Sequence, residues 1–131
     1  MKAEDSIATI ILAAGKGTRM KSPLAKVLHP LLGKPMLMFT VERAREIGSS
    51  RIVVVIGHQA DLIRDTVRDP SLTYVVQERQ LGTGHAVLMT EPSLRDFRGT
   101  ILILCGDVPL LRKRTLDKLM EEHSSSRADL T

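Results

Sequence analysis

Aromatic residues are scarce in this chain: among 131 residues there are two phenylalanines, one tyrosine and no tryptophan. Proteins that bind single-stranded nucleic acid stack successive bases on aromatic side chains, so this scarcity argues against such a binding platform. The net charge of +4 does not decide the matter, because it also suits a phosphorylated small molecule or solubility alone. We therefore expect no nucleic-acid partner.

The chain also has only one cysteine and no apolar run long enough to span a membrane. Cys105 has no second cysteine with which to form an internal disulfide. The first apolar run, residues 7–14, follows Glu4 and Asp5, which is unlike the basic start of a secretory leader. With 43% hydrophobic and 26% charged residues, the composition is typical of a globular domain. These features predict a cytoplasmic protein with no membrane partner.

Four apolar stretches of strand length alternate with helical patterns. The stretches are continuously apolar, as expected for strands covered on both faces, and they span residues 7–12, 51–57, 72–76 and 100–105. Helical spacing predicts helices over residues 35–47, 60–67, 84–94 with a break near Pro92, and 110–123. This order predicts an α/β fold: a Rossmann-like, mostly parallel sheet with helices on both faces.

The length and the C-terminal sequence bear on domain organisation. A chain of 131 residues has the size of one domain and is too short for two. After a predicted turn at 124–127, residues 128–131 look like the opening of another strand. We therefore interpret the chain as a fragment of a longer domain.

The loop after the first predicted strand is a candidate phosphate-binding site, because ligands of open parallel sheets bind at the carboxyl ends of the strands. Gly15 and Gly17 allow close backbone approach, and Lys16 and Arg19 supply positive charge. The loop lacks the third glycine of the dinucleotide fingerprint and the Gly-Lys-Ser/Thr of P-loop NTPases. A glycine turn with solvated basic side chains is the alternative. Lys26 also suits a phosphate, although an exposed lysine is the more common case.

The loop after the third predicted strand suits a pyrimidine base. Gln77 offers both an amide donor and a carbonyl acceptor, and Gly82 and Thr83 allow close backbone approach. A loop with a helix cap at Thr83 is an equal alternative. His85, at the predicted helix entry, is interpreted as a packing or capping group.

The turn after the fourth predicted strand carries a candidate metal ligand. Asp107 follows Gly106, and a single carboxylate there suits a Mg²⁺ ion shared with substrate phosphates. An aspartate that caps the turn before Pro109 is an equal alternative. Cys105 is expected to be inert core. The other histidines, His29, His58 and His123, have no metal-ligand spacing.

Taken together, four motifs resemble those of sugar-phosphate nucleotidyltransferases. They are LAAGKGTRM at 12–20, KVLHPLLGKPM at 26–36, QLGTGHA at 80–86 and CGDVPLL at 105–111. The first and last suit nucleotidyltransferases broadly. QLGTGHA is more particular to the uridylyltransferase domains of bifunctional bacterial enzymes that make UDP-N-acetylglucosamine.

The resemblance implies a function and a role for each motif residue. It implies uridylyl transfer from UTP to N-acetylglucosamine 1-phosphate, with Mg²⁺ as cofactor, in cell-wall precursor synthesis. Arg19 and Lys26 would contact the phosphates and Asp107 would bind Mg²⁺. The nucleotide itself would lie against Leu12, Ala13, Ala14, Gly15, Lys26, Gln77, Gly82, Thr83, Cys105 and Gly106.

This chain departs from the family pattern in two ways. Ala25 stands where the family usually has the proline before the lysine, and Pro23 lies two residues earlier, which questions the rigidity of this loop. The resemblance also implies that the sugar-binding half, a second metal ligand, an acetyltransferase domain and an oligomer interface lie beyond Thr131.

An enzyme that uses CTP or GTP for another phosphorylated acceptor is an alternative. A non-catalytic nucleotide-binding module is another.

Overall fold

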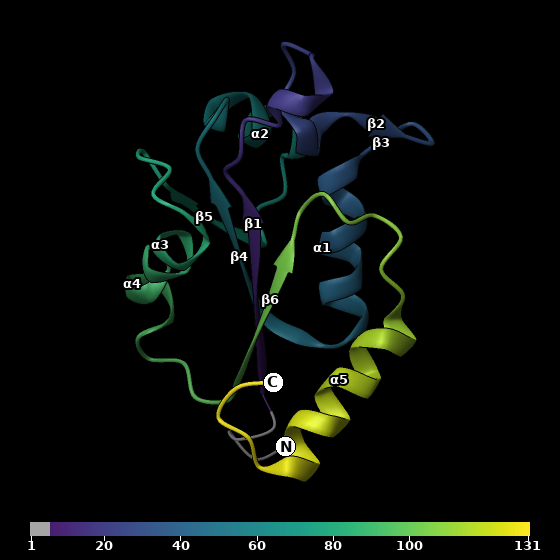
Figure 1. Cartoon of the computed structure of the whole chain (residues 1–131), viewed down its shortest axis with the longest axis vertical. Coiled ribbons are helices and arrows are strands. Elements are labelled where there is room, and N and C mark those ends of the chain that lie inside the picture. Colours follow the sequence, from purple (N-terminus) through teal and green to yellow (C-terminus); the bar gives the residue numbers. More distant parts are fainter. Residues whose placement is uncertain (1–5) are drawn as a thin grey trace.

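The computed structural model describes residues 6–131; Glu4 and Asp5, on which the expectation about a leader rests, lie outside them. One four-stranded sheet organises this part of the chain (Figure 1), with the strand order β5-β4-β1-β6 and every pairing parallel. Its strands are β1 (Ile7–Ala13), β4 (Ser49–Ile56), β5 (Leu72–Val76) and β6 (Thr100–Cys105). A short antiparallel ribbon is formed by β2 (Pro30–Leu31) and β3 (Lys34–Pro35).

Helices cover both faces of this sheet, as the sequence predicts. One face packs against α1 (Met36–Glu46), α2 (Ala60–Val67) and α5 (Lys113–Ser126), and the other against α3 (Thr83–Leu88) and α4 (Glu91–Leu94). The continuous apolar runs explain this arrangement, since successive side chains of a strand point to opposite faces. In β1, Ile10 packs on the α3 and α4 side and Ile11 on the α1 and α2 side, and both are buried.

Strand β6 is covered on one face only. Leu102 and Leu104 are buried against Leu116 of α5. On the opposite face Ile101 and Ile103 are 46% and 45% exposed. A cavity of about 590 Å³ with a mainly apolar lining lies beside this face. None of the residues in the four motifs lines this cavity.

Several expected elements differ from those observed. The helix predicted over 84–94 with a break near Pro92 is indeed interrupted, as α3 and α4, but the break falls just before Pro92, which lies in the first turn of α4, where its missing N–H leaves no helix bond unmade. The last helix begins at Lys113 rather than at 110 and continues to Ser126, so the predicted turn at 124–127 is wrong. No strand forms over 128–131. Cys105 is exposed rather than inert core, because β6 lies at the sheet edge.

One ion pair lies near the amino-terminal ends of the strands. Arg51, near the start of β4, donates two hydrogen bonds of 2.6 and 2.8 Å to the Asp96 carboxylate. These bonds lower the pKa of Asp96 to about 2. Among residues 6–131, no helix has the length and apolar character needed to cross a membrane.

Candidate functional site

The parallel sheet brings the three candidate loops together, because all four strands have their carboxyl ends on the same side of the sheet. Backbone hydrogen bonds connect the loops. The Gly106 N–H donates to the Leu12 carbonyl oxygen at 2.9 Å, and the Gln77 N–H donates to the Ile56 carbonyl oxygen at 2.7 Å. Loops distant in sequence are thereby held against one another.

A cavity of about 300 Å³ lies between the loops that follow β1 and β5. Its lining comes from the end of β1 and the loop after it (Leu12, Ala14 and Gly15), and from the loop after β5 and the start of α3 (Gln77, Gln80, Gly82, Thr83 and Ala86). Six of these residues are predicted site residues. The structure therefore brings the candidate phosphate loop and the candidate base-reading loop together.

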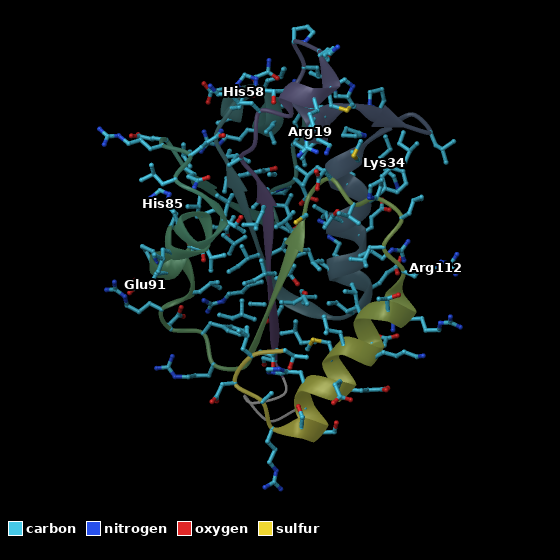
Figure 2. The ribbon with its side chains drawn as sticks, in the orientation of Figure 1. Arg19, Lys34, His58, His85, Glu91 and Arg112 are labelled. Atoms are coloured by element: carbon cyan, nitrogen blue, oxygen red, sulfur yellow. The ribbon has the colours of Figure 1, made fainter. Side chains whose placement is uncertain are left out.

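Gln77 is the most constrained polar residue of this cavity. Its side chain is 4% exposed, and its amide nitrogen lies 3.2 Å from the Gly82 carbonyl oxygen and 2.9 Å from Nδ1 of His85. His85 lies in the first turn of α3 (Figure 2). The sequence-based interpretation of His85 as a packing or capping group overlooked this contact with Gln77.

Gln80 is a second residue that sequence reasoning missed. Its side-chain amide donates to the Ala14 carbonyl oxygen and so ties the loop after β5 to the end of β1. Apart from its place in the QLGTGHA motif, nothing in the sequence indicates this contact. Gln80 therefore helps to define the shape of the cavity.

Lys26 and Asp107 form an ion pair next to this cavity. Nζ of Lys26 lies 2.7 Å from the Asp107 carboxylate, and both side chains are about one-third exposed. Lys26 is the first residue of the 3₁₀ helix η3 (Lys26–Leu28), which is anchored by the buried Val27 and Leu28. In the described residues the Asp107 carboxylate contacts Lys26 and makes no hydrogen bond to the turn before Pro109, so the capping alternative is not observed.

The remaining predicted residues lie around the cavity without lining it. Arg19 lies on the exposed 3₁₀ helix η2 (Thr18–Met20), above the carboxyl ends of the strands in Figure 2. Ala13 is buried at the end of β1. The Cys105 carbonyl oxygen accepts a hydrogen bond of 3.3 Å from Thr40, and Gly106 packs against β1. These residues support the edge of the site.

Residues 9–131 match the family described as the MobA-like NTP transferase domain. The chain belongs to this family. It is 54% identical over 126 residues, which are 95% of the chain, to the bifunctional protein GlmU of Geobacter metallireducens. This similarity confirms the resemblance drawn from the motifs. The chain spans only 26% of the length of that relative.

Solved structures share the fold of this NTP transferase domain. A nucleotidyl transferase from Methanothermobacter superposes with a TM-score of 0.75 at 26% identity, covering 88% of this chain and 57% of that one. The manganese complex of Rv0371c from Mycobacterium tuberculosis has a TM-score of 0.70 at 22% identity, covering 92% and 61%. The predicted fold class is confirmed.

The donor set at Asp107 fits a shared Mg²⁺ ion. Among residues 6–131 there is no group of three or more His, Cys, Asp or Glu side chains that could hold a metal ion alone. Mg²⁺ is usually held by one or two carboxylates together with substrate phosphates and water, so a single partly exposed carboxylate near the candidate phosphate loop is suitable. Asp107 is thus suited to contribute one carboxylate ligand to an ion shared with substrate phosphates.

Gln59 holds the loop that precedes Lys26. Its side-chain oxygen accepts a hydrogen bond of 2.6 Å from the Ala25 N–H, and its amide nitrogen donates to the Pro23 carbonyl oxygen at 2.7 Å. A proline at position 25 has no N–H and could not make the first of these bonds. The loop that sequence analysis questioned is thus fixed by hydrogen bonds.

We expect Gln59→Ala to loosen this loop. Losing two hydrogen bonds should lower the free energy of unfolding by about 1–2 kcal/mol and weaken UTP binding by about three- to tenfold, measured by urea unfolding and calorimetry. Ala25 has φ −52° and ψ 136°, which proline can adopt. Adding Ala25→Pro to Gln59→Ala should therefore restore UTP affinity. If the double variant binds no better than Gln59→Ala, loop rigidity is not the cause.

Proposed function

We propose that this chain binds UTP with Mg²⁺ and forms the nucleotide-binding part of an enzyme that transfers the uridylyl group to N-acetylglucosamine 1-phosphate. The products would be UDP-N-acetylglucosamine, a cell-wall precursor, and pyrophosphate. The observation that carries this proposal is the cavity that is lined both by the buried Gln77 and by Ala14 and Gly15. The 54% identity to a bifunctional GlmU protein supports the choice of substrates.

The proposed reaction is an in-line displacement at phosphorus. A phosphate oxygen of the sugar phosphate attacks the α-phosphorus of UTP, the bond to the β-phosphate oxygen breaks, and pyrophosphate leaves. Arg19 and Lys26 would neutralise negative charge on the phosphates, and the loop amides would orient them. Asp107 would hold Mg²⁺, which supplies further charge stabilisation at phosphate oxygens when bound. No residue of this chain needs to act as a nucleophile or a general base.

We propose that the acceptor binds outside this chain. The chain spans about a quarter of the length of the GlmU relative, which leaves most of that protein's length to hold an acceptor site. In this proposal residues 1–131 bind nucleotide in the cytoplasm and have little or no transferase activity alone. The sugar-binding half, the acetyltransferase domain and the homo-oligomer interface would belong to the longer protein.

Competition binding with UTP, CTP and GTP in the presence of Mg²⁺ tests the proposal. We expect UTP to bind at least about tenfold more tightly than the others, because a base-reading site leaves its polar groups unpaired with the wrong base. A preference for CTP or GTP would instead favour a transferase for another acceptor. Equal binding with and without Mg²⁺ would favour a non-catalytic nucleotide-binding module.

A further inference from the structure

The buried amide of Gln77 is held in a single orientation. The Gly82 carbonyl oxygen, 3.2 Å from the amide, can only accept a hydrogen bond, so the atom that faces it must be the nitrogen Nε2. The reverse orientation would place two oxygen acceptors against each other in a side chain that is 4% exposed. This contact uses one of the two hydrogens on Nε2.

The second hydrogen on Nε2 determines the tautomer of His85. Nδ1 of His85 lies 2.9 Å from the same Nε2. The amide nitrogen of Gln77 can only donate a hydrogen bond, so Nδ1 of His85 must accept it with its lone pair. The proton of the His85 ring must then lie on the other ring nitrogen, Nε2 of His85. Both hydrogens of the Gln77 amide are then occupied by the protein.

The carbonyl oxygen Oε1 is consequently the only group of the Gln77 amide left for a ligand. Within the described part of the chain Oε1 has no hydrogen-bond partner. It is also not among the fully buried polar atoms that lack a partner, so it remains accessible. Gln77 lines the 300 Å³ cavity. A free amide presents a donor or an acceptor by rotation, whereas this one presents an acceptor only.

We propose that His85 is a positioning residue that makes this site selective for uracil over cytosine, an inference that rests on the proposed nucleotide binding. With Nε2 held by Gly82 and His85, Oε1 accepts a hydrogen bond from the N3–H of uracil. Cytosine has an unprotonated N3 acceptor at that place, so two lone pairs would face each other. His85 never contacts the base. It acts by preventing the Gln77 amide from turning to accommodate cytosine.

Substitution of His85 tests the proposal through nucleotide selectivity. In His85→Leu the amide loses one of its two restraints, and the ratio of UTP to CTP affinity should fall by about three- to tenfold, mainly through a gain in CTP binding. His85→Asn places a side-chain oxygen near the position of Nδ1 and should restore the ratio. A purely structural role would instead weaken both nucleotides equally and leave the ratio unchanged.

A second readout follows the tautomer directly. In ¹⁵N NMR spectra of the unaltered chain, His85 should show an unprotonated Nδ1 and a protonated Nε2, with the resonances assigned from their loss in His85→Asn. A ring protonated on Nδ1 would overturn the inference even if selectivity is present. Binding of UTP and CTP with equal affinity by the unaltered chain would overturn the uridine assignment together with the inference. An unchanged ratio in His85→Leu, with UTP preference intact, would overturn the inference alone.

Discussion

Replacing Asp107 with alanine is expected to remove the gain in UTP affinity that Mg²⁺ provides. Asp107 is the only carboxylate paired with Lys26 at the carboxyl end of β6 in the described residues, and it is the proposed protein ligand of the ion. Loss of groups that merely orient metal ligands costs about 10–100-fold in metal affinity, so loss of a ligand should cost at least as much. Calorimetric titration of UTP with and without Mg²⁺ measures this effect.

The affinity of Asp107→Ala for UTP in the absence of Mg²⁺ gives a more specific test. The Asp107 carboxylate repels the triphosphate and competes with it for Lys26. Its removal should therefore let UTP bind as well as, or more tightly than, it binds the unaltered chain when Mg²⁺ is absent. Asp96→Ala is the matched control, because it also removes one exposed carboxylate that is paired with a basic side chain, but at the opposite edge of the sheet. A normal Mg²⁺ dependence in Asp107→Ala would remove this residue from the metal site.

In the complete enzyme, Asp107→Ala should also slow uridylyl transfer. Removing one preorganised electrostatic contact with the transition state typically costs about 3 kcal/mol, or about a hundredfold in rate. The fold should be intact, since the Asp107 side chain is 34% exposed and an exposed ion pair contributes little to stability.

Gly17→Ala is expected to impair both the stability of the fold and nucleotide binding. Gly17 has a φ of +62°, and a Cβ added there would lie 2.6 Å from Cβ of Lys26. The left-handed backbone costs an alanine about 1–2 kcal/mol, and the steric overlap requires either the Gly17 loop or Lys26 to shift. If this shift breaks the charge-assisted contact that we propose between Lys26 and phosphate, UTP binding should weaken by about ten- to a hundredfold.

Gly33→Ala separates these two effects. Gly33 also has a positive φ, +78°, but a Cβ added there meets nothing within 4 Å. It should therefore lower the free energy of unfolding by about 1–2 kcal/mol and leave UTP affinity unchanged, as measured by urea unfolding and calorimetry. If both glycine variants bind UTP equally well, close packing of Gly17 against Lys26 has no part in binding.

Strand positions were predictable because the strands of the parallel sheet, including the edge strand β6, are largely apolar runs. The stretch predicted at 100–105 matches β6, and the one at 7–12 falls one residue short of the end of β1. Helix ends were less predictable, since they depend on local caps. Arg127, for example, ends α5 in a left-handed conformation that the sequence does not signal. Exposure of Cys105 was also unforeseen, because a run of apolar residues does not reveal whether its strand lies at the edge of a sheet.

The sequence by itself determined the fold class, the four strand-end loops and the family, since these follow from local apolar patterns and contiguous motifs. Only the tertiary structure decided which side chains meet across those loops. The Lys26–Asp107 ion pair, the Gln59 bonds to the loop before Lys26 and the tie from Gln80 to Ala14 each join residues at least 34 positions apart. Such contacts form because the carboxyl ends of parallel strands lie side by side. A local pattern of residues does not predict which side chains then meet.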